Sequence, residues 1–158
     1  SDLESARLRE QGYRDALADA GIPFDPSLVQ AGEFRPAESA AAANRLLDQN
    51  PRPTAIFAAN DLSAIETMRV ARERGLSVPR DLSVIGFDNI PEAAQTSPPL
   101  TTVDQSIQQM GFEAVRMLVG LIRGEAATPL RVTLPTELVV RQSCAPPPRP
   151  RRRGRSAA

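Results

Sequence analysis

Apolar residues follow two different patterns along the chain. Thr54–Ala59 and Leu82–Phe87 are almost continuously apolar, which predicts strands that are covered on both faces of a parallel sheet. Elsewhere apolar residues recur every three or four positions, which predicts helices. Because strand and helix signals alternate, the pattern indicates an α/β fold with a parallel, doubly wound sheet and right-handed crossovers.

Four segments have helical periodicity together with a start or stop signal. They cover about residues 2–20, the stretch from Pro36 to the "NPRP" sequence, the stretch from Asp61 to Gly75, and about 106–123. Asp61 is expected to cap the third helix. The predicted buried faces are, in chain order, Tyr13, Ala16, Leu17 and Ala20; Ala40, Ala43, Leu46 and Leu47; Leu62, Ile65, Met68 and Ala71; and Ile107, Met110, Ala114, Met117, Leu118 and Leu121.

Three shorter segments have strand signals. These are Ser27–Phe34, Leu130–Leu134 and Glu137–Val140, the last two separated by Pro135. Gln95–Gln105 is interpreted as a proline-containing connector. From Pro146 onward the chain is rich in proline and arginine, which predicts a disordered tail.

Polar residues follow the two apolar runs at the point where each strand should end. Asn60-Asp61 follows the first run and Asp88-Asn89 the second, while Phe34 ends a shorter predicted strand. Ligands of open α/β sheets bind outside the carboxyl ends of the strands, so these residues could line a binding crevice. The alternative is that they only cap a helix or form a turn, and for Asp61 capping is the favoured interpretation.

Composition argues against most enzyme classes. The 158 residues include no histidine and no lysine, so a Ser-His-Asp triad, a Schiff-base lysine and a histidine metal site are excluded. Neither a G-x-G-x-x-G nor a P-loop pattern occurs. Acid-base work by paired carboxylates is left open, but we predict a protein that is not an enzyme and has no cofactor or metal. The net charge is zero and the longest apolar runs are too short for a bilayer, so neither nucleic acid nor membrane is indicated as a partner of these residues.

Three stretches resemble one known family. They are "ESARLREQGYRDALADAGI", the segment from "PTAIFAAND" through "GFDNIP" to "PPLTTVDQ", and the closing "LPTELVVRQS". Together they resemble the effector-binding domain of the lactose/galactose repressor family of bacterial transcription regulators. The resemblance implies a fold like a type I periplasmic sugar-binding protein, with two lobes and an effector between them. It also implies a cytoplasmic regulator that couples effector binding to operator affinity.

The resemblance assigns roles to six residues. Asn60 and Asp88 match positions that bind effector hydroxyls, and an ionised carboxylate can accept from two adjacent hydroxyls. Arg9 matches a donor to effector oxygen, although a solvated helix face would also suit an arginine there. The remaining candidates are Ser5, one helical turn before Arg9; Phe34, at an aromatic position that packs on the ligand; and Gln105, in the connector.

The resemblance also divides the chain and implies its partners. Residues 1–105 match the second lobe, 106–134 return to the first lobe, 135–145 return to the second, and 146–158 form the tail. We therefore expect the apolar face of the helix at 106–123 to pack on a sheet that these residues do not contain, and operator DNA to be bound only through an N-terminal domain outside them. A sugar transport receptor with the same fold is the alternative function. A homodimer is expected through Ile65, Glu66, Met68, Arg69 and the Pro91–Ser97 region.

Overall fold

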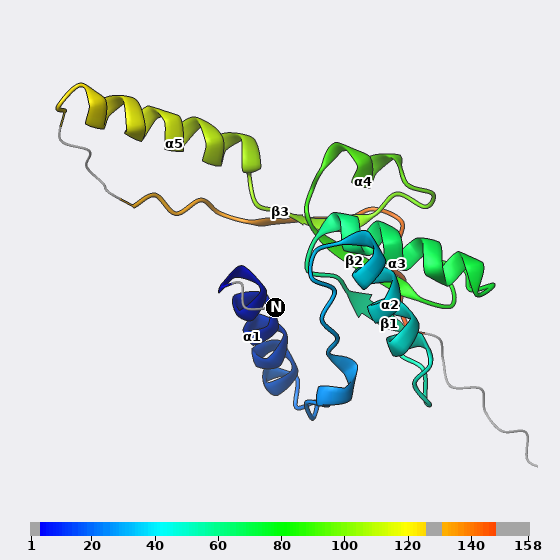
Figure 1. Cartoon of the computed structure of the whole chain (residues 1–158). Coiled ribbons are helices and arrows are strands. Elements are labelled where there is room, and N and C mark those ends of the chain that lie inside the picture. The colour runs from blue at the N-terminus through cyan, green and yellow to red at the C-terminus, as the bar shows by residue number, and fades with distance from the viewer. Residues whose placement is uncertain (1–3, 126–130, 148–158) are drawn as a thin grey trace, which may run out of the picture.

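A four-stranded sheet forms the centre of the fold. The computed structural model describes residues 4–125 and 131–147 (Figure 1). The strands are β1 (Ala55–Phe57), β2 (Ser83–Asp88), β3 (Thr101–Asp104) and β4 (Glu137–Val139), in the order β1-β2-β3-β4. The first three are parallel, and β4 is antiparallel to β3. The prediction of an α/β fold with a mainly parallel sheet is confirmed.

The four predicted helices are all present. They are α1 (Glu4–Asp19), α2 (Pro36–Leu47), α3 (Asp61–Glu73) and α5 (Ile107–Ile122). Pro36 occupies the first position of α2, where its missing N–H costs nothing. Gly75 adopts φ +73 directly after α3, as a helix-terminating glycine does. A short 3-10 helix (Pro26–Leu28) and the short helix α4 (Pro91–Gln95) complete the helices of the described residues.

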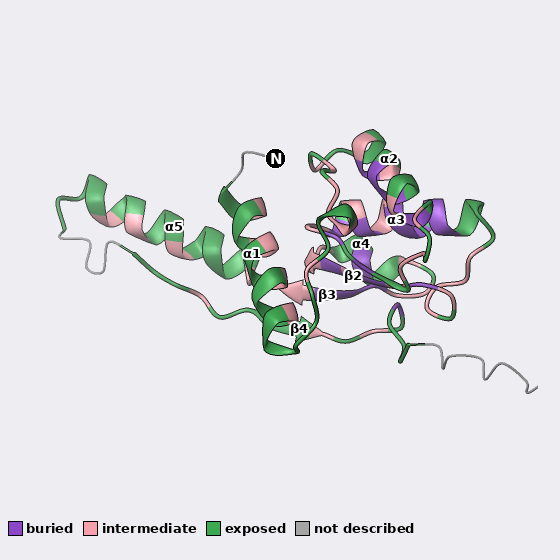
Figure 2. Cartoon of the chain, turned by 90° about the horizontal axis from the view of Figure 1, so that it is seen from below, coloured by how far each residue is buried: buried purple, intermediate pink, exposed green. Residues whose placement is uncertain are grey.

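The core lies between one face of the sheet and the pair α2 and α3. Leu82, Val84 and Leu100 from the sheet region are fully buried, as are Ala64 and Ala71 of α3. Figure 2 shows the buried residues gathered where α2 and α3 meet the strands. This layer therefore supplies the hydrophobic stabilisation of the described fold and fixes the ends of β1 and β2.

The opposite face of the sheet is only loosely covered. Phe57 in β1 is 40% exposed, and no residue of α1 is buried. The prediction that both faces of β1 are covered is therefore wrong within the described residues, as is the prediction of a buried face on α1. In Figure 1, α1 stands apart from the layer formed by α2 and α3.

The predicted strand at Ser27–Phe34 is absent. Asp25 caps the 3-10 helix by accepting from the Ser27 N–H at 2.9 Å, and the segment that follows is irregular. Its backbone groups bond locally, as in the Arg35 N–H to Gly32 carbonyl bond, and β1 pairs with β2 alone among the described strands. A sequence with strand preference forms a strand only where it can pair with a neighbouring strand, and no described strand pairs with this segment.

Two further strand predictions are corrected near the end of the chain. The part of Leu130–Leu134 that the structure describes, 131–134, is not a strand, and Leu130 lies outside the described residues. Conversely, the connector at 95–105 contains β3, where Thr101 and Thr102 are buried. Sequence reasoning missed β3 because buried threonines do not register as an apolar run. The predicted final strand is present as β4.

The predicted apolar faces of α3 and α5 are covered to different extents in the structure. In α3, Met68 and Ala71 are buried as predicted, but Leu62 is 53% exposed. In α5 no residue is buried, so the described chain leaves its apolar face uncovered, and packing of that face on a sheet outside these residues stays a prediction. None of the helices in the described residues combines the length and the apolar character needed to span a membrane. Of the predicted tail, residues 148–158 lie outside the described residues.

Candidate functional site

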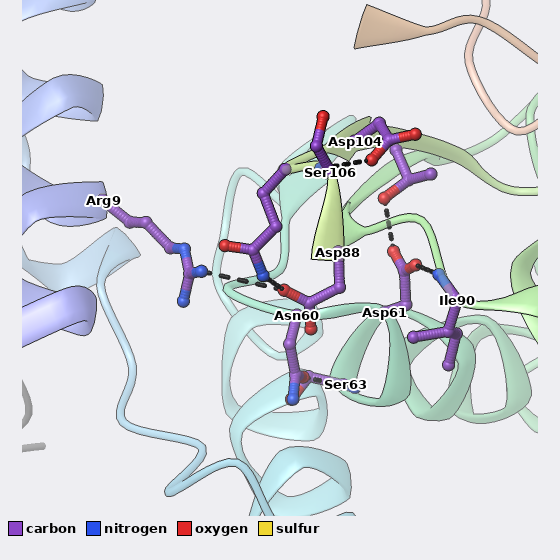
Figure 3. Close-up of polar contacts among 10 residues, drawn as sticks. Arg9, Asn60, Asp61, Ser63, Asp88, Ile90, Asp104 and Ser106 are labelled. Carbon is purple, nitrogen blue, oxygen red and sulfur yellow. Dashed lines mark hydrogen bonds and ion pairs between the residues drawn. The ribbon is translucent and has the colours of Figure 1, made fainter. Parts of the chain in front are cut away.

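Polar side chains from three strand ends and from α1 meet at one edge of the sheet. Asn60 follows β1, Asp88 ends β2, and Gln105 follows β3. Because these strands are parallel and adjacent, their carboxyl ends lie together (Figure 3). Arg9 of α1 extends toward this edge from the loosely covered face. The structure thus brings together residues that are widely separated in the sequence.

Asp88 is the centre of this arrangement. Its carboxylate accepts a hydrogen bond from Gln105 Nε2 at 2.6 Å and lies 3.7 Å from Arg9 Nη2. Burial raises the pKa of Asp88 above its ordinary value, the positive charge of Arg9 opposes that rise, and the negative charge of Asp61 adds to it. Asp88 is therefore a half-buried acceptor with two donors already aimed at it.

Arg9 is not a solvated residue of an exposed helix face. Its side chain is 16% exposed, and its guanidinium carbon lies 4.0 Å from the centre of the Phe87 ring. A guanidinium on an aromatic face is held by the cation–π attraction, which restricts its rotamers. Phe87 and Asp88 together orient the donor groups of Arg9 at the end of β2.

The turn after β2 has a strained backbone. Asp88 has φ +119 and Asn89 has φ +57, values that cost about 1–3 kcal/mol for each non-glycine residue. Asn89 Nδ2 donates to Asp104 Oδ2 at 2.9 Å, and Arg141 Nη2 donates to Asn89 Oδ1 at 2.7 Å. The Ser106 N–H and Asn89 hydrogen bonds lower the pKa of Asp104. The sequence placed Asn89 at the end of the second apolar run without assigning it a role, and it did not identify Asp104 or Arg141. An Asp-Asn pair tolerates the left-handed region better than most residues.

The prediction for Asp61 is wrong, because Asn60 is the cap of α3. Asn60 Oδ1 accepts from the Ser63 N–H at 2.9 Å. Asp61 is fully buried instead, where it accepts from Thr102 Oγ1 at 2.5 Å and from the Ile90 N–H at 2.9 Å. The aspartate therefore joins α3, β3 and the turn after Asp88, and it is unavailable to a ligand (Figure 3).

Phe34 and Ser5 lie beside this group. Phe34 is half-buried in a turn, and it lines a cavity of about 310 Å³ together with Arg9, Phe57 and Ser63. Ser5 lines an adjoining, more open cleft together with Arg9 and Phe87. Arg9 thus borders both the cavity and the cleft. The side-chain oxygen of Asn60 caps α3, and its Nδ2 group donates no hydrogen bond among the described residues.

The chemistry of these groups suits a neutral, hydroxyl-rich molecule. A carboxylate, a guanidinium and two side-chain amides supply acceptors and donors beside aromatic rings. In the described part of the chain, His, Cys, Asp and Glu residues form no group of three that could hold a metal ion.

Comparison with known proteins gives the family. Residues 1–144 match the sequence profile described as a periplasmic binding protein-like domain. The chain belongs to this family. The relatives of this periplasmic binding protein-like chain include the HTH-type transcriptional regulator CelR of Thermobifida fusca, 42% identical over 142 residues, and DegA of Bacillus subtilis, 46% identical over 138 residues. These alignments cover 90% and 87% of the chain but 42% and 41% of the relatives, so the chain spans about two fifths of their length.

Solved structures agree with the sequence comparison. The transcriptional regulator CelR–cellobiose complex matches 85% of the chain and 41% of its own, with a TM-score of 0.80 and 44% identity. A sugar-binding transcriptional regulator of the LacI family from Escherichia coli, complexed with phosphate, matches 92% and 52%, with a TM-score of 0.81 and 36% identity. The resemblance to the effector-binding domain of this regulator family is confirmed.

Proposed function

We propose that the chain is the effector-binding part of a bacterial LacI-type transcription regulator and that its ligand is a sugar or polyol. The observation that carries this proposal is the half-buried Asp88 carboxylate at the strand ends, faced by Arg9 and Gln105. The regulators among its relatives, one of them solved with cellobiose, support the same class of ligand. They also favour a regulator over the transport receptor that the sequence left open.

Each candidate residue has a role in this proposal. Asp88 accepts from two adjacent hydroxyls, while Arg9 donates to a ligand oxygen. Gln105 exchanges its bond with Asp88 for one with the ligand. Asn60 contributes only its Nδ2 donor, because its oxygen caps α3. Ser5 adds a hydroxyl and Phe34 an aromatic surface from the adjoining hollows.

The Asp88→Asn substitution tests the proposed site. It keeps the shape of the side chain but removes the ionised acceptor, so we expect about 10- to 100-fold weaker sugar binding. Titration calorimetry on the natural full-length protein, with cellobiose first and then other disaccharides and polyols, measures the affinity. Asp48→Asn is the matched control, because Asp48 is an exposed carboxylate that pairs with Arg74 away from the strand ends. Equal affinities for wild type and Asp88→Asn would remove Asp88 from the binding site.

The regulatory partners follow from the same proposal. Residues 1–105 would form the second lobe, with 106–134 returning to the first, 135–145 to the second and 146–158 as a tail. The uncovered apolar face of α5 supports this division, because α5 needs a surface that the described chain does not supply. Operator DNA would be bound by a domain outside these residues, and the regulator would act in the cytoplasm.

We also propose that two copies pair through the outer face of α3 and the segment 91–97. Met68 is withdrawn from the predicted interface, because it is buried in the core. Leu62 is exposed on the same helix, Ile65 is half-buried, and Arg69 pairs with both Glu66 and Glu73. Exposed apolar side chains beside paired charges are typical of a protein interface, which has an apolar core and a polar rim.

Substitution of Leu62 by glutamate tests the proposed dimer. A charge at the centre of the interface would have to be desolvated, so we expect the Leu62→Glu protein to sediment as a monomer where the wild type sediments as a dimer. Ile22→Glu is the control, since Ile22 is equally exposed at 53% but lies in the loop after α1. The proposal is withdrawn if the wild type is monomeric, or if Leu62→Glu remains a dimer.

A further inference from the structure

Two consecutive residues, the last of β2 and the first of the turn after it, have left-handed backbone conformations, and neither is glycine. Asp88 has φ +119 and Asn89 has φ +57. Residues held in such regions persist only where surrounding contacts determine the conformation, and they cluster at binding sites. The direction of the Asp88 carboxylate depends on this turn, because the side chain is fixed to a backbone that would otherwise relax.

The contacts that hold the turn come from the ends of two other strands. Asn89 Nδ2 donates to Asp104 Oδ2 at 2.9 Å at the end of β3. Asn89 Oδ1 accepts from Arg141 Nη2 at 2.7 Å, and Arg141 follows β4 by two residues. Both ends of the Asn89 side chain are therefore occupied, one by the Asp104 carboxylate and the other by the Arg141 guanidinium.

Arg141 is itself fixed in place. Its Nη1 donates to the Leu100 carbonyl at 2.7 Å, and its backbone N–H donates to Thr101 Oγ1 at 3.0 Å. The guanidinium thus connects the start of β3 to the turn after β2 and uses two different nitrogens to do so. A lysine could not make both contacts, because its ammonium lacks the planar fork.

We propose that Arg141 and Asn89 are positioning residues that aim the Asp88 carboxylate at the ligand. This inference rests on the proposed function, in which Asp88 is the ligand acceptor. With the Arg141 contact in place, Asn89 stays in the left-handed region and Asp88 stays between Arg9 and Gln105. Without it the turn relaxes, the carboxylate moves toward solvent, and the donors of Arg9 and Gln105 lose their acceptor.

Two variants separate positioning from simple stabilisation. Arg141→Met keeps the length of the side chain and removes its donors. Asn89→Gly removes both amide contacts. Glycine adopts positive and negative φ about equally well, so the chain can still fold while nothing holds residue 89 in the left-handed region. Arg80→Met is the control, because Arg80 is exposed and precedes β2, at the end of the strand opposite Asp88. Arg141→Lys serves as the conservative variant and should recover part of each effect.

The first measurement does not need a ligand. The carboxyl carbon resonance of Asp88 in the 158-residue chain is titrated by NMR in each variant. The charged groups that shift the pKa of Asp88 are Arg9 and Asp61, and Asp104 is its neighbour in register on β3; all three remain in every variant. Since burial is the main cause of the raised pKa, we expect the pKa of Asp88 to move down toward its ordinary value in Arg141→Met and Asn89→Gly, and to stay unchanged in Arg80→Met.

The second measurement uses cellobiose and the related sugars with the natural full-length protein. Each positioning variant should bind about tenfold more weakly, as expected for the loss of one well-aimed hydrogen bond. An unchanged Asp88 pKa in both variants overturns the inference whatever the sugar result. If no sugar binds the wild type, the proposed function fails, while the titration still decides whether Arg141 and Asn89 hold Asp88 in place.

Discussion

Replacing Asp61 by alanine is expected to remove about 3–5 kcal/mol of the free energy of unfolding. The carboxylate is fully buried and accepts from both Thr102 Oγ1 and the Ile90 N–H. Alanine leaves both donors unpaired in an apolar layer, and each unpaired buried group costs about 1–3 kcal/mol. Urea unfolding of the 158-residue chain, followed by circular dichroism, measures the change.

Two further variants make this expectation specific. Asp61→Asn keeps one carbonyl acceptor, so its loss should be clearly smaller than that of Asp61→Ala. Asp48→Ala removes a carboxylate that is 65% exposed, and surface ion pairs contribute only about 0–1 kcal/mol. If Asp61→Ala and Asp48→Ala unfold at the same urea concentration, the buried contacts of Asp61 do not stabilise the fold.

Replacing Gly86 by alanine is expected to destabilise the chain by about 3 kcal/mol or more, at the upper end of overpacking costs. A Cβ at this position would lie 2.2 Å from Asp61 Oδ1 and 3.1 Å from Leu100 Cδ2. Gly86 lies in β2, and the missing side chain is what allows the Asp61 carboxylate to approach the strand. The same urea unfolding experiment measures this loss.

A double substitution tests whether the clash with Asp61 causes the destabilisation by Gly86→Ala. Because Asp61→Ala removes the atom that the new Cβ would meet, Gly86→Ala should cost much less in that background, and the two effects should not add. Gly111→Ala is the control, since Gly111 lies in α5 with open space around it and alanine there should stabilise the helix by about 0.5–1 kcal/mol. Additive effects of Asp61→Ala and Gly86→Ala would show that the clash lies elsewhere.

The sequence predicted helices and buried strands where local signals and packing agree. Pro36 and Gly75 mark helix ends through their own backbone preferences. The start of α2 and the end of α3 could therefore be predicted to within a few residues. The prediction of a strand at 27–34 was wrong because a strand must pair with a neighbouring strand, and no described strand pairs with this segment. Strand β3 was missed because its buried residues include Thr101 and Thr102, whose hydroxyls are paired by Arg141 and Asp61.

The candidate site was predictable in part. Asp88 and Gln105 were both named as candidates from the family resemblance, but their contact could not be predicted, because β3, the strand that Gln105 follows, was missed. The exchange of roles between Asn60 and Asp61 could not be read from the sequence, because both residue types cap helices well. Asp61 turns inward at a place where Gly86 of β2 has no side chain, so the Asp61 carboxylate can approach the strand.

The exposed α5 gives the 158-residue chain two levels of local stability. In α3 the backbone hydrogen bonds open only if the core opens, because Ala64, Val70 and Ala71 are packed against the sheet. In α5 no side chain is buried, so its opening is governed by the helix–coil equilibrium of a 16-residue segment, which is marginal in water. Amide protons of α5 should therefore exchange with solvent through frequent local opening, whereas exchange of those in α3 and β2 should require global unfolding. Any surface that covers α5 would slow that exchange, and the protection factors of this one helix would report when the surface is in place.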